Sequence, residues 1–175
     1  MSMHLHPADT TPAITKSNDP PNIAKQNDTC KDRTPLSLIA GAVDISYALH
    51  NQINGSTVSL IHGSMAGQKL YSVSIYPERR IELWESPTRQ ELFDFAQANA
   101  ELLLKPRHAL GTGYDDWNQV HVLDVVILDP NRDAALALAL RYGQIAIFDL
   151  GSRREIPVSR PSEILLAGHA GGVNA

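Results

Sequence analysis

The sequence predicts a single α+β domain: a mixed β-sheet with two main helices on one face and a C-terminal β-α-β unit. Three observations indicate this fold class. Residues 121–158 have the pattern of a strand, a helix and a strand, with signals at both ends of the helix. Residues 57–84 contain short stretches in which apolar and polar side chains alternate, as they do in half-buried strands. The 175 residues are 43% hydrophobic and 19% charged, which is the balance of a globular protein.

The domain is predicted to span residues 36–160. Residues 1–35 are polar and are predicted to form a disordered tail, and residues 161–175 are predicted to form a flexible C-terminal tail. Cys30 is the single cysteine, which excludes a disulfide within the chain and favours a reducing compartment. No apolar run reaches the ~18 residues typical of a membrane span. The expected location is the cytoplasm, and the alternative is delivery into a host cell through an export signal in residues 1–35.

The first half of the domain is predicted to contain antiparallel strands. Residues 36–49 fit either a short helix or a strand followed by a turn, and Asn-Gly at residues 54–55 is a strong turn signal. Residues 57–62 then fit a strand, which makes a hairpin. Residues 70–76 form an alternating strand, and residues 79–84 alternate as well and are predicted to be its hairpin partner.

A helix is predicted to begin after Thr88, because Thr88 and Glu91 have the spacing of a capping box. Apolar residues then recur at helical spacing until the helix ends near Pro106. Asn99 lies in the middle of this apolar stripe, where a buried amide needs hydrogen-bond partners. Residues 107–120 are predicted to form a loop.

The strongest pattern is at the C-terminal end. Residues 122–128 are an almost continuous apolar strand, and Asp-Pro at residues 129–130 predicts an N-cap followed by proline in the first helical position. Gly143 is predicted to end this helix. Residues 145–150 form the next strand, which is expected to lie parallel to the first through a right-handed crossover. A short strand follows at residues 154–158.

The acidic residues of the strands do not predict a metal site. Asp124 is near the start of its strand and Asp149 is near the end of the next, so parallel pairing would separate them along the sheet. Asp149 is expected to cap a turn toward Gly151, and Asp124 is expected to be paired or to face solvent. The net charge of −4 gives no electrostatic argument for binding nucleic acid.

No complete catalytic set is present in the sequence. Ser64 does not lie in a nucleophile-elbow pattern, and Cys30 lies in the N-terminal tail. The glycine-rich residues 108–113 lack the lysine of a phosphate-binding loop and precede a strand. No catalytic residue, cofactor or metal is therefore predicted.

The candidate site is an acidic and aromatic loop at residues 107–121. Aromatic side chains are common anchors of protein interfaces. The alternative is that the tryptophan of this loop packs back over the first helix. The predicted interaction residues are Tyr114, Asp115, Asp116, Trp117 and His121.

Three further polar residues are given structural roles. Asn99 and Gln144 lie in apolar surroundings and are expected to hydrogen-bond either with each other or with the loop at residues 107–120. Asp149 is the third residue given a structural role, because it is expected to cap the turn toward Gly151.

Several segments, in this order, resemble an uncharacterised domain family carried by bacteriophages and mobile elements. The most specific is the strand with the pattern Gln-x-Ala-Ile-Phe-Asp-Leu. The resemblance implies a genetic context rather than a chemistry, because no activity is established for that family. The segments are residues 71–74, Phe95 with residues 99–102, Trp117, residues 123–125, residues 144–150 and residues 155–156.

These observations predict a non-enzymatic accessory protein of a phage, plasmid or integrated element that binds a protein partner through residues 107–121. The alternative is an enzyme, or a protein that binds a small ligand or a metal, with a site around Asp115, Asp116, His121 and Asp149. Neither the identity of the partner nor the oligomeric state follows from the sequence.

Overall fold

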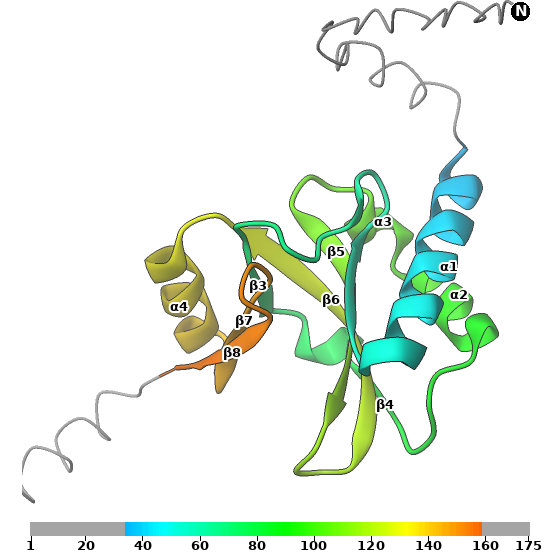
Figure 1. The fold of residues 1–175 in the computed structure, drawn as a ribbon. Coiled ribbons are helices and arrows are strands. Elements are labelled where there is room, and N and C mark those ends of the chain that lie inside the picture. Colours follow the sequence, from blue (N-terminus) through cyan, green and yellow to red (C-terminus); the bar gives the residue numbers. More distant parts are fainter. Residues whose placement is uncertain (1–33, 159–175) are drawn as a thin grey trace, which may run out of the picture. The chain divides into compact units, whose positions relative to one another are not determined.

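The structure, a computed structural model, describes residues 34–158. Within this range it contains four α-helices and an eight-stranded sheet, which confirms the α+β class (Figure 1). The interpretations that concern Cys30, the N-terminal tail up to residue 33 and the C-terminal tail lie outside the described residues.

Residues 36–49, which fitted a helix or a strand, belong to helix α1 (Pro35–Ile53). The Thr34 hydroxyl caps its start by accepting a hydrogen bond from the backbone N–H of Ser37 at 3.3 Å. Asn54 ends the helix in the left-handed conformation, and its N–H donates to the carbonyl of His50. The Asn-Gly signal at residues 54–55 therefore marks a helix end, and the hairpin predicted there is wrong.

A long hairpin forms the centre of the sheet. Strand β5 (His108–Asp115) pairs with β6 (Val120–Asp129) over its whole length. The loop predicted for residues 107–120 is therefore wrong. Glycine made these residues look like a loop, but Gly111 lies in the strand where a Cβ would be tightly packed, 3.0 Å from Cγ1 of Val126.

All recorded strand pairs are antiparallel, so the mixed sheet and its parallel neighbours are corrected. Strands β6 and β7 do run in the same direction, as the predicted β-α-β unit requires, but β3 lies between them and pairs with both. The order across the sheet is β2 (Gly63–Ser64), β1 (Ser56–Ser59), β5, β6, β3 (Tyr71–Ser74), β7 (Ala146–Asp149) and β8 (Arg154–Pro157).

Two short strands share the second edge of β6. Strand β3 covers its end, and β4 (Ile81–Leu83) covers its first half, so β4 is not the hairpin partner of β3 that the sequence predicted. The chain leaves this edge between them through the short 3-10 helix η2 (Pro77–Arg79). Asp124 and Val125 therefore have no strand opposite them on this side of β6.

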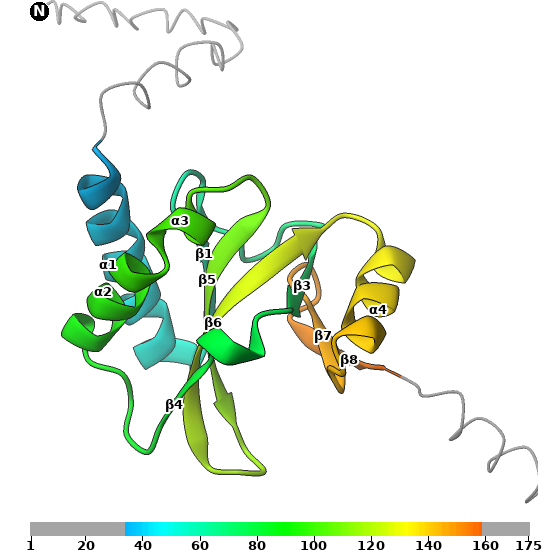
Figure 2. The same cartoon turned by 180° about the vertical axis from the view of Figure 1, so that it is seen from behind.

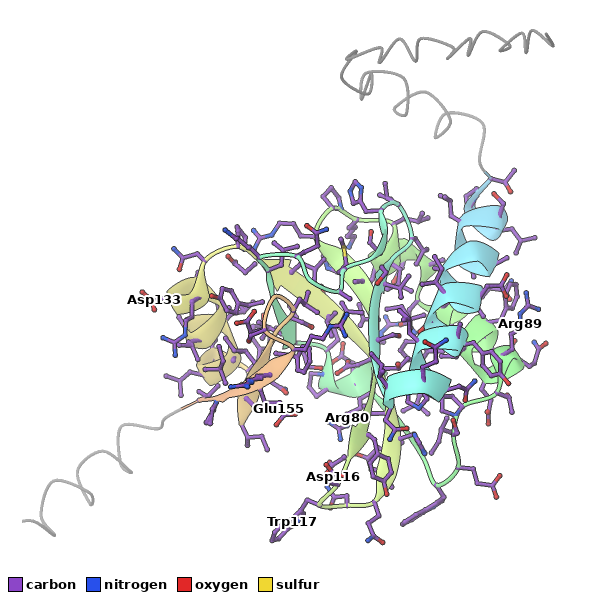
Figure 3. The ribbon with its side chains drawn as sticks, in the orientation of Figure 1. Arg80, Arg89, Asp116, Trp117, Asp133 and Glu155 are labelled. Atoms are coloured by element: carbon purple, nitrogen blue, oxygen red, sulfur yellow. The ribbon has the colours of Figure 1, made fainter. Side chains whose placement is uncertain are left out.

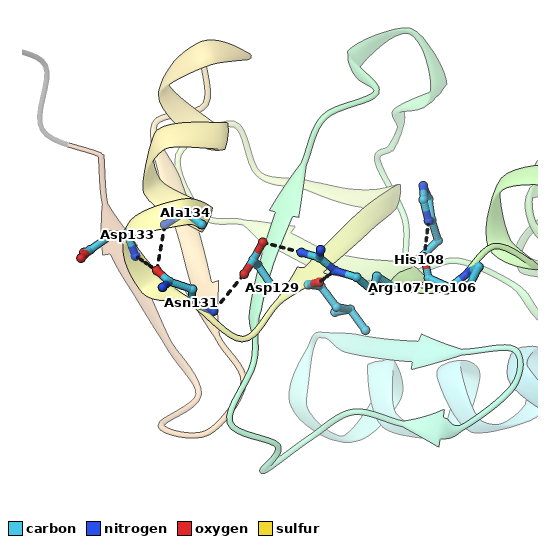
Figure 4. Close-up of polar contacts among 8 residues, drawn as sticks. Pro106, Arg107, His108, Asp129, Asn131, Asp133 and Ala134 are labelled. Carbon is cyan, nitrogen blue, oxygen red and sulfur yellow. Dashed lines mark hydrogen bonds and ion pairs between the residues drawn. The ribbon is translucent and has the colours of Figure 1, made fainter.

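Helix α4 (Arg132–Arg141) begins two residues later than predicted, with Asn131 rather than Asp129 as its N-cap (Figure 4). The Asn131 side chain accepts from the backbone N–H groups of Asp133 and Ala134. The carboxylate of Asp129 instead accepts from the N–H of Asn131 at 2.9 Å and pairs with Arg107. Gly143 follows the helix with a φ of 68°, as its position predicted.

The helices pack on one face of the central strands. Leu123 and Val125 of β6 belong to the cluster formed with α1, α2 (Arg89–Ala98) and α3 (Ala100–Leu103), and Ile127 contacts the cluster formed with α4. Alternate residues of a strand point to opposite faces, so these three share one face. Helices α1 and α2 lie side by side (Figure 2).

Truncation of the core and of the surface should differ sharply in cost. Leu92 of α2 is fully buried, whereas Leu140 of α4 is 45% exposed. Leu92→Ala should lower the free energy of unfolding by about 2–5 kcal/mol because it leaves a cavity. Leu140→Ala, the matched control, should change it by less than about 1 kcal/mol. Urea denaturation measures both, and equal losses would contradict the assigned core.

Candidate functional site

The tip of the β5–β6 hairpin is held by a network of local hydrogen bonds. Oδ1 of Asp115 accepts from the backbone N–H groups of Trp117 and Asn118, each at 3.1 Å, and Oδ2 accepts from the Asn118 amide at 2.9 Å. The bonds from Asn118 are the main reason that the pKa of the Asp115 carboxyl lies below its usual value. Gln119 completes the turn in the left-handed conformation. The turn is therefore internally fixed.

The tip presents Trp117 to solvent. Its side chain is 93% exposed, so the alternative in which it packs back over a helix is wrong. Figure 3 shows Asp116 and Trp117 at the end of the hairpin, pointing away from the sheet. A single exposed apolar side chain is common on protein surfaces, so the exposure of Trp117 gains weight together with other exposed aromatic surface nearby.

Trp84 is a second exposed tryptophan at the same end of the sheet. Leu83 pairs with His121, so Trp84 follows at the level where the hairpin tip begins. Its side chain is 83% exposed. The alternation in residues 79–84 did not settle which side of the strand Trp84 occupies. The predicted pairing of residues 79–84 with residues 70–76 gave no reason to place Trp84 beside Trp117.

Carboxylates surround the two tryptophans. Arg80 is the cation among them, and it pairs with Glu82 at 3.0 Å and with Asp115 at 3.5 Å. Glu85 and Asp116 are exposed and have no recorded ion pair within residues 34–158. We call this surface the acidic-aromatic end; it comprises Glu82, Trp84, Glu85, Tyr114, Asp115, Asp116 and Trp117.

His121, a predicted interaction residue, belongs instead to a polar network beneath α1. Its Nδ1 lies 2.8 Å from Nε2 of His50, and its ring centroid is 4.8 Å from that of Tyr114. His50 is 1% exposed, and its Nδ1 lies 3.0 Å from the hydroxyl of Thr112. Burial is the main cause that lowers the pKa of His50 to about 4, so its imidazole is neutral at pH 7.

Hydroxyl groups extend this network. The Thr112 hydroxyl lies 3.0 Å from that of Ser56, which lies 2.6 Å from that of Ser46. Because the network joins α1 to β1, β5 and β6, it anchors the helix to the sheet. Sequence reasoning missed it because the partners are far apart in the chain, and only the finished sheet brings them together.

Asp124 is the one buried carboxyl with an unsatisfied oxygen in the part of the chain that the structure describes. It is 8% exposed, and its Oδ1 has no hydrogen-bond partner. The expectation that it is paired or faces solvent is therefore wrong. Burial raises the pKa of Asp124 to about 7, and the charge of Arg80 opposes this shift.

The polar residues that were given structural roles have separate partners. The Asn99 amide donates to the carbonyl of Phe95 at 2.9 Å and is buried at the junction of α2 and α3. No recorded hydrogen bond joins the side chains of Asn99 and Gln144 to each other or to residues 107–120, so neither expected arrangement is found. Asp149 caps the turn after β7 as predicted, accepting from the N–H of Gly151 at 2.9 Å.

The structure does not assemble the alternative site. Asp149 lies opposite Tyr71, which also faces Asp129 at the last residue of β6, whereas Asp115 faces Val120 at its first. The length of β6 therefore separates Asp149 from Asp115, roughly 30 Å at about 3.3 Å per residue. Among residues 34–158, no three His, Cys, Asp or Glu side chains are grouped so that they could hold a metal ion.

Comparison with known proteins found no matching family model, no matching curated protein and no matching solved structure. Of the helices between residues 34 and 158, none combines the length and the apolar character needed to cross a membrane.

The two buried titratable groups give opposite pH dependences of stability. The pKa of His50 falls from 6.5 to about 4 on folding, so its contribution is complete above pH 6.5 and is lost as the pH falls toward 4. The pKa of Asp124 rises from 3.8 to about 7, so its contribution is complete below pH 3.8 and is lost as the pH rises toward 7. Between these limits the two effects oppose each other.

Replacing either side chain should leave only the pH dependence of stability that the other one causes. Relative to the wild type, Asp124→Asn should gain stability as the pH rises from 4 to 7, by on the order of 2–3 kcal/mol. His50→Gln should gain stability relative to the wild type in the opposite direction, as the pH falls from 6.5 to 4. Urea denaturation at a series of pH values measures this, with exposed Glu155→Gln as control. Parallel profiles for all four proteins would contradict the assignment.

Proposed function

We propose that this protein binds a protein partner through the acidic-aromatic end, as a non-enzymatic accessory protein of a phage, plasmid or integrated mobile element. The observation that carries the proposal is the exposure of Trp117 and Trp84 at the same end of the sheet. Tryptophan is the residue type most enriched among the few that dominate binding energy in protein interfaces.

The geometry of the tip favours tight association. Asp115 and Asn118 hold the turn in one conformation before any partner arrives, so binding orders few additional bonds. The hydrogen bonds of the turn use none of the indole of Trp117, which leaves its whole surface available. A preformed turn with an exposed indole is therefore suited to insertion into a pocket of a partner.

The charges around the tryptophans favour a basic partner surface. Asp116 and Glu85 are exposed without a recorded ion pair, and a positively charged surface would be drawn toward them. The acidic character also argues against nucleic acid, whose phosphates carry the same sign.

The proposed genetic context rests on the resemblance to the phage and mobile-element family. Four of its segments lie on neighbouring strands of the sheet, namely β3, β6, the β7 region and β8. They are residues 71–74, 123–125, 144–150 and 155–156. The resemblance therefore covers mainly the scaffold, and of the two exposed tryptophans it includes Trp117 and not Trp84.

The test is affinity capture from a lysate of the host cell with quantitative mass spectrometry. We expect at least one protein to be retained by the wild type and lost by the double variant Asp116→Ala, Trp117→Ala. Ile145→Ala with Glu155→Ala is the matched control, because it removes an exposed apolar and an exposed acidic side chain outside the acidic-aromatic end (Figure 3 labels Glu155).

Thermal melting shows whether each variant folds. The tip makes no contribution to the core, so both double variants should melt within a few degrees of the wild type. If the two double variants lose the same proteins, or if neither loses any, the acidic-aromatic end is not the binding surface.

A further inference from the structure

A groove lies between β4 and helix α2. Its volume is about 470 Å³, which is in the range of sites that hold small ligands or a few side chains of a peptide. Its apolar lining comes from Ile81 and Leu83 of β4, Leu123 of β6, and Phe95 and Ala98 of α2. Ile81 is among the exposed large apolar residues of the domain. Phe95 and Leu123 are buried and form its floor, so the uncovered apolar surface is that of Ile81, Leu83 and Ala98.

The outer edge of β4 is open and borders this groove. Strand β4 pairs with β6 along one edge, and no second strand within the described range pairs with it. An open edge presents backbone N–H and C=O groups that can pair with an extended chain. Because Ile81 and Leu83 line the groove, a chain that paired with this edge would run along it.

The groove is surrounded by negative charge. Its two arginines are already matched: Arg79 pairs with Glu101, and Arg80 pairs with Glu82 and Asp115. The carboxylates of Glu78 and Asp94 line the groove in addition, and neither forms a recorded ion pair with the described residues. Carboxylates therefore outnumber cations, which favours a basic occupant.

We propose that this groove binds an extended basic segment of a partner protein, which adds to the outer edge of β4 as a further strand. The inference rests on the proposed function, because it names the chemistry of the partner. In strand addition, main-chain hydrogen bonds supply affinity and alternate side chains supply specificity. On the face of the segment that points into the groove, apolar side chains lie over Ile81 and Leu83, and lysine or arginine side chains at the ends of that same face reach Glu78 and Asp94.

Trp84 makes the binding observable. It follows Leu83 at the end of β4 and is exposed, so a chain that continued along this edge would pass beside its indole. A cation of the segment gains further from the face of that ring. The chain contains two tryptophans, so Trp117→Phe leaves Trp84 as the sole reporter and Trp84→Phe leaves Trp117.

The probe is a pool of short blocked peptides in which one face carries valine or isoleucine at its centre and lysine or arginine at both ends, and the other face carries threonine. We expect the basic pool to shift the fluorescence of the Trp117→Phe variant to shorter wavelength, and a pool with glutamate in the charged positions to have no effect. Adding Glu78→Lys and Asp94→Lys should weaken binding about tenfold. Asp133→Lys with Glu155→Lys, an equal change of charge elsewhere (Figure 3), should weaken it far less.

Strand pairing has its own readout. Successive N–H groups of a strand point to opposite sides, so methylating alternate backbone nitrogens of the tightest peptide should abolish binding in one frame and preserve it in the other. Equal binding of both methylated peptides would overturn strand addition. No response to the basic pool, or an equal response to the acidic pool, would overturn the inference as a whole.

The outcome separates the inference from the proposed function. If capture of a partner depends on Asp116 and Trp117 but no basic peptide shifts the emission of Trp84, the proposed function stands and the groove is not its peptide site. Sedimentation tests the other occupant of an open edge. A dimer that Glu78→Lys with Asp94→Lys dissociates, without peptide binding, would show that a second copy of the chain covers β4 and would overturn the inference.

Discussion

The ladder between β5 and β6 is the constraint on which the rest of the domain depends. Every other strand reaches the sheet through one of these two: β1 through β5, and β3 and β4 through β6. The same ladder brings His121 and Thr112 under α1, where they meet His50. Helix packing, the polar network and the position of the acidic-aromatic end therefore follow from the register of one hairpin.

The parts of the fold that were predictable have strong local signals. The capping box of Thr88 and Glu91, the end of α4 at Gly143 and the turn held by Asp149 each depend on residues close together in the chain. Strand pairing is different, because it depends on contacts that no local pattern encodes. Strand β3 lies between β6 and β7 in the sheet, although helices α2 and α3 separate it from both in the chain. Nothing in the residues of β3 indicates this position.

The candidate site was predictable in composition and not in conformation. The sequence placed Tyr114, Asp115, Asp116 and Trp117 together because they are adjacent, but it assigned them to a loop because Gly111 and Thr112 resemble turn residues. Glycine at residue 111 serves the close approach of Val126 instead. The roles of Trp84 and His50 could not be predicted for another reason: each depends on a partner on a strand far along the chain.

At the tip of the β5–β6 hairpin, the residues that shape the turn are different from the residues whose side chains face solvent. Asp115, Asn118 and Gln119 determine the shape of the turn, whereas the side chains of Asp116 and Trp117 form none of its hydrogen bonds. The two positions can therefore accept many amino acids without disturbing the strands. Such a surface can change the partner that it selects by substitution at two codons, while the framework that displays it remains the same.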